Sequence, residues 1–512
     1  MGLNRMIRGV TRREILAGGA AAAAGFGAVS AAAAGPASAA GTAGGKAAGA
    51  KDKRPNVLFV AIDDMNDWTG WQGGYPGVKT PNLDRLARLA TGFTRAYTPA
   101  AACNAARAAI LFGVEPFNSG IYRNASADWS DTALAKKRSI VRWFRDQGYE
   151  TVGTGKTFHT GWRKPSLVPE HNDPDAWTQF EYLPQLFEGG GDELTWRGEG
   201  VTADKEDVGR AEWLVENVLA KTHDKPFFAA LGVRKPHLPW ILPQEWFDKY
   251  PVDSLVYPLG ALDTEHSAIS MNEDDRDLPQ AARAFIRQHV EDHRKILNGR
   301  GWKSAIQAYL AAVSFADHAI GVALDGLLAG PNASNTIVCV WSDHGWQLGE
   351  KLAWRKFTLW ERATRVPLLI GGAGLRSGLS DALISTIDLY PTLTELCGGE
   401  APDHLDGVSF AAYLKGEAKE PRDHVLSTWC LDVDGDGDPS NDRHFAVRSR
   451  THRLIAYGNG DRELYDHRTD PWEWRNLLFK GDAASASSAS DLERRLPKSS
   501  VPEARAGQGV ED

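Results

Sequence analysis

The 512-residue sequence has few cysteines, no excess of positive charge and few long apolar runs. Its four cysteines, at positions 103, 339, 397 and 430, form no Cys-x-x-Cys pair, so we expect no zinc site, and their spacing settles no disulfide pairing. The net charge is −8, and no basic tract suggests nucleic-acid binding. Beyond the N-terminal region no apolar segment stands out as suited to crossing a bilayer, so we expect no stable membrane span.

The first residues are typical of an export signal. Residues 11–16 contain a twin-arginine pattern, an Ala- and Gly-rich run follows to about residue 34, and residues 37–39 fit an Ala-x-Ala cleavage site. The run has too few large apolar side chains for a good membrane anchor. We expect residues 1–39 to be a signal peptide for the twin-arginine translocase and residues 40–53 to be a flexible linker. The mature protein would then be periplasmic or extracellular.

The rest of the chain is long enough for one large domain and a smaller one. Near-continuous apolar runs, typical of strands buried in a parallel sheet, occur at residues 56–62, 226–233 and 336–341, and residues 149–152 also indicate a strand. From about residue 401, shorter alternating segments between turn residues indicate a small antiparallel sheet. We expect a catalytic domain at 54–400, a C-terminal subdomain at 401–480 and a disordered, Ala- and Ser-rich tail at 481–512.

Acidic, histidine and lysine residues follow several of the predicted buried strands. Because the carboxyl ends of parallel strands meet at one edge of a sheet, we expect these side chains to converge. Carboxylates there supply oxygen ligands for Ca²⁺ or Mg²⁺, and cations suit a tetrahedral oxyanion. Taken singly, each residue is weak evidence, because ordinary solvated loops carry such side chains and a lone histidine after a strand is more often structural or solvated than catalytic. The converging residues would be Asp63, Asp64, Lys156, His159, His237, Asp343 and His344.

Cys103 begins an Ala-rich segment that predicts a helix ending at Gly113. Arg107 lies four residues later, so helical geometry places its guanidinium beside the Cys103 side chain. A helix N-terminus also offers backbone N–H groups and the positive end of the helix dipole. Two interpretations stay open from these residues alone: a reactive site for an anion, or a buried and inert cysteine with a solvated arginine.

Residues 432–438 imitate the start of an EF-hand loop, with aspartates at alternate positions and a glycine. The closing glutamate is missing, because Arg443 stands there, and neither flank is clearly helical. We therefore prefer an acidic surface loop to a second calcium site.

Several segments, in order along the chain, match one known family. Cys103-Asn104-Ala105-Ala106-Arg107 fits the Cys-x-(Pro/Ala)-x-Arg signature of the sulfatases, and Arg54 to Asp64 resembles their opening strand. The sequence resembles that family, and most closely its iduronate-2-sulfatase branch, from residue 54 to about residue 478. Further matching motifs are Gly155 to His159, Lys235-Pro236-His237, Ser342 to Glu350, Trp354-Arg355-Lys356, Glu463 to Asp466 and Asp470 to Glu473.

The resemblance implies an α/β fold like that of alkaline phosphatase: a mostly parallel mixed sheet flanked by helices, with a smaller C-terminal antiparallel-sheet subdomain. It implies that a separate formylglycine-generating enzyme oxidises Cys103 to Cα-formylglycine. It also implies one Ca²⁺ with ligands from Asp63, Asp64, Asp343, His344 and the modified residue 103. His344 replaces the asparagine that is common in the family, a variant shared with the iduronate branch.

The resemblance also implies a role for each remaining residue. Arg107 and Lys156 would hold the hydrated aldehyde, one hydroxyl of which attacks sulfur. His237 and Lys356 would bind the sulfate and assist the leaving oxygen. His159 would help to deprotonate the second hydroxyl, which expels sulfate and restores the aldehyde. Asp343 could help to deprotonate the attacking hydroxyl.

Three positions depart from the family pattern. Ala106, Phe112 and Val114 replace two hydroxyl residues and a cation, and this bears on how well the modifying enzyme recognises the segment. We expect an exported sulfuric ester hydrolase that cleaves an O-sulfate ester of a carbohydrate. Its partner would be a sulfated saccharide or a sulfated small molecule.

Two alternatives stay open. One is a phosphodiesterase or phosphonate monoester hydrolase of the same superfamily, and the other is a non-catalytic binding protein in which Cys103 is unmodified. Tryptophans could form a sugar-binding platform or could pack in loops; those concerned are Trp162, Trp177, Trp196 and Trp240.

Overall fold

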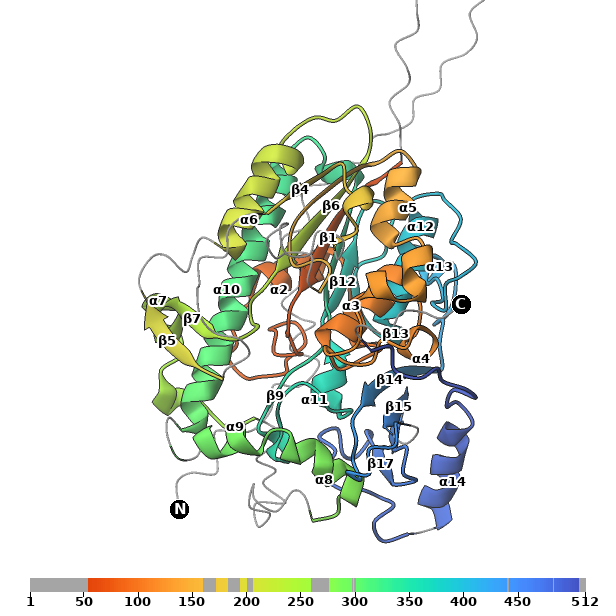
Figure 1. The fold of residues 1–512 in the computed structure, drawn as a ribbon. Helices are drawn as coiled ribbons and strands as arrows, with labels where there is room; N and C mark the ends of the chain where they lie inside the picture. The colour runs from red at the N-terminus through yellow and green to blue at the C-terminus, as the bar shows by residue number, and fades with distance from the viewer. Residues whose placement is uncertain are drawn as a thin grey trace, which may run out of the picture. The chain divides into compact units, whose positions relative to one another are not determined.

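A mixed β-sheet lies at the centre of the structure (Figure 1). The computed structural model describes residues 54–159, 172–182, 194–199, 206–258, 276–296, 298, 301–439, 442–481 and 483–505, all within one compact unit. Within these residues nine strands form the sheet, in the order β11-β2-β12-β8-β1-β6-β3-β4 with β13 paired to β2. The strands are β1 (Asn56–Ile62), β2 (Thr91–Tyr97), β3 (Glu150–Gly155), β4 (Gln179–Glu181), β6 (Phe227–Val233), β8 (Thr336–Ser342), β11 (Arg365–Val366), β12 (Leu368–Gly371) and β13 (Gly378–Ser385).

The five strands from β8 to β4 run parallel, and this part of the sheet matches the expectation from the sequence. Strand β1 lies between β8 and β6, and Ile62 at its end pairs with both Ser342 and Val233. The next strand, β3, pairs with β6, with Gly155 opposite Gly232. Four neighbouring strands therefore end at the same edge, and the residues that follow them are brought together.

Successive side chains of β1 enter two separate cores, as the period of a strand requires. Leu58, Val60 and Ile62 pack with helices α2 (Pro81–Leu89), α6 (Asp207–Leu214) and α10 (Trp302–Ala329). Val57, Phe59 and Ala61 pack with α3 (Cys103–Phe112), α5 (Ile140–Asp146) and α12 (Leu389–Leu396). Figure 1 shows α6 and α10 on one side of the sheet and α3, α5 and α12 on the other.

Helix α10 corrects one expectation from the sequence. By length and composition it could cross a membrane, although we expected no such segment in the folded part of the chain. However, 78% of its most apolar 18-residue window is buried inside the protein, against the sheet and α6. The apolar character of α10 is therefore explained by the core that it helps to form.

The C-terminal part contains the expected antiparallel sheet, made of β14 (His424–Cys430), β15 (Arg443–Ser449), β16 (His452–Ala456) and β17 (Arg462–Asp466). The prediction of a disordered tail was wrong for most of its length. Helix α14 (Ala483–Glu493) lies against β15 and β16, and Ala489 and Leu492 pack with Val447, Leu454 and Leu464. Alanine favours helix, and the sheet offers this helix an apolar face to cover.

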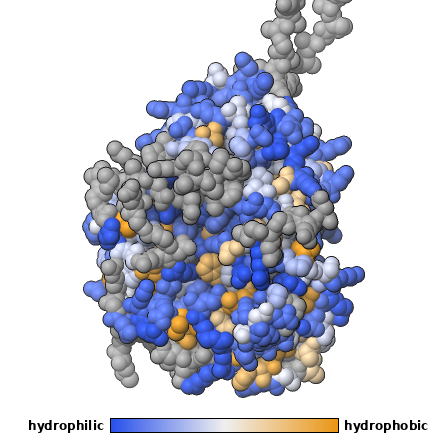
Figure 2. Space-filling view, in the orientation of Figure 1, coloured by the Kyte–Doolittle hydropathy of each residue, from blue (hydrophilic) through white to orange (hydrophobic). Residues whose placement is uncertain are grey.

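The tryptophans considered for a sugar-binding platform differ in burial. Trp177 and Trp240 are buried, Trp196 is half-buried, and Trp162 lies outside the described residues. In the view of Figure 2 the visible surface is mainly hydrophilic, with small scattered apolar groups.

Shorter elements complete the fold. They are α4 (Pro116–Ser119), α7 (Gln244–Asp248), α8 (Gln280–Arg287), α9 (Val290–Lys295), α11 (Glu361–Thr364), α13 (Ala411–Lys415), β5 (Trp196–Glu199), β7 (Trp240–Pro243), β9 (Gln347–Leu348) and β10 (Trp354–Arg355).

Candidate active site

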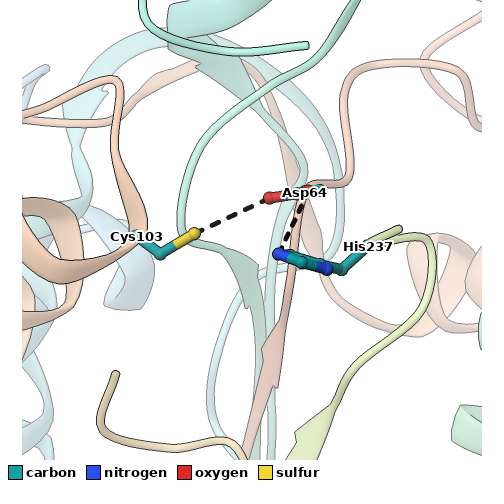
Figure 3. Close-up of side chains that lie close together, drawn as sticks. All are labelled: Asp64, Cys103 and His237. Carbon is teal, nitrogen blue, oxygen red and sulfur yellow. Dashed lines mark hydrogen bonds and ion pairs between the residues drawn. The ribbon is translucent and has the colours of Figure 1, made fainter. Parts of the chain in front are cut away.

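The polar residues that follow the parallel strands meet at one edge of the sheet, as predicted. Asp63 and Asp64 follow β1, Asp343 and His344 follow β8, and Lys156 follows β3. Figure 3 shows Asp64 between Cys103, at the start of α3, and His237, on the loop after β6. The site therefore forms where four strands end and helix α3 begins.

Cys103 is completely buried and surrounded by charged groups. Its Sγ lies 3.0 Å from Lys356 Nζ, 3.1 Å from His344 Nε2 and 3.8 Å from Asp64 Oδ1. Burial raises the pKa of the thiol, but Lys156 and Lys356 more than offset this, and the net pKa lies below the usual value. The environment therefore favours negative charge at the position of the sulfur, and the interpretation of Cys103 as inert loses support.

Arg107 links the carboxylates of the site. Its Nε donates to Asp343 Oδ2 at 2.8 Å, its Nη2 lies 3.3 Å from Asp63 Oδ1, and its Nη1 donates to the carbonyl oxygens of Lys156 and Thr157. The side chain is fully buried, so the alternative of a solvated arginine is wrong. Guanidinium geometry suits this arrangement, because its fixed donors reach several acceptors at once.

Three carboxylates lie close together. Oxygen atoms of Asp63, Asp64 and Asp343 are all within 4.8 Å of one another, and all three residues are buried. Burial raises the pKa of Asp63, but Lys156, His237 and Arg107 together hold it well below its usual value. The pKa of Asp64 is raised well above its usual value by burial and by Cys103 and Asp63, although Lys356 opposes this. Asp64 thus needs either a proton or additional positive charge.

The donor set suits a hard divalent cation. Asp64 Oδ2 is buried without a hydrogen-bond partner, and carboxylate oxygens are the preferred ligands of Ca²⁺. His344 donates from Nδ1 to the carbonyl of Gly345 at 2.9 Å, so Nε2 is the nitrogen that faces Asp64 and Cys103. Without a cation, burial lowers the pKa of His344, but Asp343 and Cys103 raise it to about 9. A histidine held in this orientation is suited to ligate a metal ion.

Lys356 enters the site from a strained loop. The residues on each side of it, Arg355 and Phe357, have positive φ angles of 68° and 74°. The strain is balanced by specific contacts: Arg355 Nη2 binds Asp292 at 2.9 Å, and the Phe357 amide donates to the carbonyl of Ala101 at 3.1 Å. Such conformations persist where the surroundings hold them, and here they direct Nζ to 2.8 Å from Asp64 Oδ1.

The remaining predicted residues lie at the same edge. Lys156 Nζ pairs with Asp63 Oδ2 at 2.7 Å. His237 donates from Nδ1 to the carbonyl of Leu238 at 2.7 Å, and its Nε2 lies 3.9 Å from Asp64 Oδ2. His159 is near enough to be affected by the charges of Lys156 and Asp63. Burial lowers the pKa of both histidines well below the usual value.

Some contributing residues were missed in the sequence. Tyr309 of α10 donates to the Asp64 carbonyl and accepts from the Asn66 amide, both at 2.9 Å. The Ser342 Oγ accepts from the Met65 amide at 3.0 Å. These contacts hold Asp64 in its left-handed conformation, with φ of 67°. For Tyr309 no local pattern could have revealed the role, since 245 residues separate it from Asp64.

The three departures from the family pattern are accommodated by the core. Ala106 and Phe112 are fully buried and Val114 nearly so. The Phe112 ring packs against Trp129, with centroids 4.9 Å apart, and against Phe158 at 6.3 Å. An aromatic side chain thus fills the space on this side of α3, and the departures leave the polar contacts of Cys103 and Arg107 intact.

The acidic loop at residues 432–439 satisfies its own backbone. The Asp432 carboxylate accepts hydrogen bonds from the amides of Gly435 at 2.6 Å and Gly437 at 3.1 Å. Asp434 Oδ1 accepts from Asn459 Nδ2 at 3.1 Å. These contacts are those of a surface turn, and among the described residues the loop is not one of the clusters with metal-binding geometry.

Comparison with known proteins identifies the family. The model of the sulfatase family matches residues 55–399, and that of the C-terminal region of N-sulphoglucosamine sulphohydrolase matches residues 349–501. A sulfatase of Formosa agariphila is 32% identical over 88% of this chain and 87% of its own length. Human iduronate 2-sulfatase is 28% identical over 72% of this chain and 73% of its own.

Solved structures agree on the fold. The phosphonate monoester hydrolase of Silicibacter pomeroyi superposes with a TM-score of 0.69 at 21% identity, covering 86% of this chain and 94% of the other. This similarity confirms the alkaline-phosphatase-like fold class expected from the sequence. A family match over two thirds of the chain, together with a relative of 32% identity, shows that this protein belongs to the sulfatases, which are enzymes that hydrolyse sulfate esters.

Proposed function

We propose that the protein hydrolyses an O-sulfate ester of a carbohydrate, using a Cα-formylglycine derived from Cys103 and one calcium ion. The main support is the set of contacts around Cys103, whose sulfur lies within 4 Å of Lys356, His344 and Asp64. This arrangement places cations and carboxylates around one buried atom. The carbohydrate is suggested by a relative, iduronate 2-sulfatase, whose name specifies a sugar acid.

The ligands of Ca²⁺ would be Asp63, Asp64, Asp343 and His344, with the side chain of residue 103 completing the set. When bound, the ion would supply positive charge for the sulfate oxygens and would relieve the repulsion between Asp63 and Asp64. Lys156 and Arg107 already neutralise part of the carboxylate charge, so a divalent ion would leave the site with a net positive charge, which suits an anionic sulfate.

The formylglycine would supply, as its hydrate, an oxygen nucleophile that can later release sulfate. Arg107 and Lys156 hold the carboxylates that surround this residue. Lys356 Nζ, 3.0 Å from the sulfur, is placed to bind an anionic oxygen. An anionic sulfate near His237 Nε2 would favour its protonated form, so that this nitrogen can give a proton to the leaving oxygen. His159 and Asp343 would accept the protons of the hydrate.

The first test asks whether Cys103 is modified. Mass spectrometry of the peptide over residues 95–123, from protein made in its native host, should show the mass of formylglycine in place of the thiol. Cys103→Ala should abolish hydrolysis of an aryl sulfate, whereas Cys397→Ala, at a buried cysteine directly after α12 and outside the site, should retain it. Finding only the thiol would instead support a non-catalytic binding protein.

The second test separates sulfate ester from phosphodiester hydrolysis. The rate with a sulfate and with a phosphodiester of the same phenol should differ strongly in favour of the sulfate, and a panel of sulfated sugars should identify the substrate. A preference for the phosphodiester would support the phosphonate monoester hydrolase alternative instead.

The proposal includes export through the twin-arginine translocase after modification. The signal at residues 1–39 and the linker at 40–53 lie outside the described residues. The support for export is the pattern Arg12-Arg13 before an Ala- and Gly-rich run. Replacing both arginines by lysine should leave the protein in the cytoplasm, and unchanged export of that variant would contradict the proposal.

A further inference from the structure

Helix α3 lacks a cap of its own. Ala102 precedes the helix and has no side chain that could accept a hydrogen bond from the first turn. The acceptor comes from another segment, because Asn124 Oδ1 accepts from the Asn104 amide at 3.0 Å. The Asn104 side chain in turn donates to the carbonyls of Ser126 and Ala127, both at 3.3 Å. The loop at residues 122–127 therefore holds the residue next to Cys103.

A C-terminal segment braces this loop. We call residues 501–505 the strap. Its backbone is paired with the chain that leads into the loop: the Val501 amide donates to the Phe117 carbonyl and the Ala504 amide to the Gly120 carbonyl, both at 2.9 Å. At the far end the Ala127 amide donates to the Ala504 carbonyl at 2.8 Å. The strap thus runs beside the loop along its length.

The side chain of Glu503 joins the strap to the loop. Its Oε1 accepts hydrogen bonds from Ser126 Oγ at 2.6 Å and from Arg123 Nε at 2.7 Å, and its Oε2 binds Arg123 Nη2. Ser126 Oγ also accepts from the amides of Tyr122 at 3.2 Å and Arg123 at 2.9 Å, so this hydroxyl closes the turn of the loop. The Glu503 side chain is only 6% exposed. Its carboxylate is therefore a fixed anchor at the centre of the loop.

Close approach requires glycine at position 120. The residue has φ of 79°, and a Cβ there would lie 2.8 Å from the Pro502 carbonyl oxygen. A residue with a side chain at position 120 would therefore collide with the backbone of the strap.

We propose that Glu503 is a positioning residue for residue 103, acting through Ser126 and Asn104 on the first turn of α3. The inference rests on the proposed hydrolase function, in which residue 103 supplies the nucleophile. Reacting groups must be held to within a fraction of an ångström, so loosening the first turn should reduce turnover more than substrate binding.

The test compares three variants on an aryl sulfate, far below their melting temperatures. Glu503→Ala should lower kcat on the order of tenfold with KM nearly unchanged. Glu503→Gln keeps an oxygen for Ser126 Oγ and should recover most of the kcat. Glu493→Ala is the control for loss of a C-terminal ion pair: the Glu493 carboxylate, which is 39% exposed, binds Arg462 at 2.9 Å, and neither residue belongs to the site or to the loop at residues 122–127. Its kcat should be that of the wild type.

Two kinetic results would overturn the inference: a wild-type kcat in Glu503→Ala, or an equal loss of kcat in Glu503→Ala and Glu493→Ala. If Glu503→Ala does not fold, Arg123→Gln removes the same ion pair from the loop side and should lower kcat in the same direction. An unchanged kcat in that variant would also contradict the positioning role of Glu503.

Hydrogen exchange provides a readout that needs no activity. In Glu503→Ala the amides of residues 103–106 and 120–127 should exchange several-fold faster, with α5 unchanged. If the wild type is itself inactive on sulfate esters, the proposed function fails, whereas the strap is still judged by exchange. Equal exchange in both proteins would overturn it.

Discussion

Arg107 shows at the scale of one residue how buried charges depend on one another. Its guanidinium is the shared partner of Asp63 and Asp343, and it is not exposed at all. Removing one member of a buried pair leaves the other charge without compensation, which costs more than the pair itself contributes.

Arg107→Gln should lower the free energy of unfolding by about 3–5 kcal/mol. Urea denaturation in calcium-free buffer, followed by tryptophan fluorescence, would measure the loss. The control is Arg450→Gln, which breaks ion pairs with Asp381 and Glu420 at the surface, where the arginine is 47% exposed, and should cost less than about 1 kcal/mol. Equal losses would show that the buried pairs of Arg107 are no stronger than exposed ones.

His444 predicts a pH dependence of stability. It is fully buried, donates from Nε2 to the Leu431 carbonyl at 2.8 Å and accepts at Nδ1 from the Gly458 amide at 3.0 Å, so it is neutral when folded. Burial lowers its pKa to about 4, although the hydrogen bond to Leu431 opposes this. An unfolded histidine has a pKa of about 6.5, so below that pH the unfolded chain binds the extra proton.

Stability should therefore fall as the pH drops from about 6.5 to 4, and His444→Gln should remove on the order of 3 kcal/mol of this fall. Denaturation curves at pH 7, 5.5 and 4 for both proteins would measure the difference. Parallel pH profiles for the two proteins would contradict the assignment.

At the scale of elements, helix α10 contributes to the candidate metal site through one hydroxyl. Tyr309 is fully buried, and its hydrogen bonds to the Asp64 carbonyl and the Asn66 amide fix the turn after β1. Groups that hold ligands in place typically change metal affinity when removed, although they do not touch the ion.

Tyr309→Phe should weaken calcium binding about tenfold, seen as a smaller rise of Tm on adding calcium. Tyr75→Phe is a matched control, because Tyr75 donates to the Val256 carbonyl at 2.7 Å and accepts from the Val256 amide at 3.1 Å, away from the site. The Tm of both variants should fall, but only Tyr309→Phe should respond less to calcium. An unchanged calcium response in that variant would refute the role of Tyr309.

At the scale of the whole molecule, buried ion pairs join the central sheet to the C-terminal sheet. Glu361 of α11 binds Arg448 of β15 and Arg453 of β16, and Trp360 Nε1 donates to Glu463 of β17 at 3.0 Å. Burial raises the pKa of Glu361, but Arg448, His467 and Arg453 together lower it well below its usual value. Glu361 is therefore ionised in the folded protein, and the two sheets should unfold together.

Calorimetry of the wild type should show one transition. Glu361→Ala leaves Arg448 and Arg453 without this partner and should lower the free energy of unfolding by about 3 kcal/mol, with a separate, earlier transition for the C-terminal sheet. Asp381→Ala, at an exposed pair with Arg450, should keep a single transition. A single transition in Glu361→Ala would mean that apolar contacts alone couple the sheets.

Much of this architecture could be predicted, because its signals are local in sequence. Apolar runs predicted β1, β6 and β8, and the polar residues directly after them predicted the site, since parallel strands share an edge. Contacts between distant residues left no such signal: the Tyr309 hydroxyl and the Glu503 carboxylate act on groups 245 and 377 residues away. For the tail, composition indicated disorder, but the sheet face that α14 covers is a property of the folded chain.

The burial of Cys103 has a consequence in time. Its side chain has no exposed surface, and the loop at residues 122–127, which is itself bonded to the strap, holds the amide of the next residue, Asn104. An enzyme that oxidises this cysteine needs to reach it, so it would have to act while the chain is still open. The fraction of chains in which Cys103 is oxidised to formylglycine would then depend on the rate of oxidation relative to the rate of folding. Conditions that delay folding, such as lower temperature during synthesis, should change how many molecules become competent for the reaction.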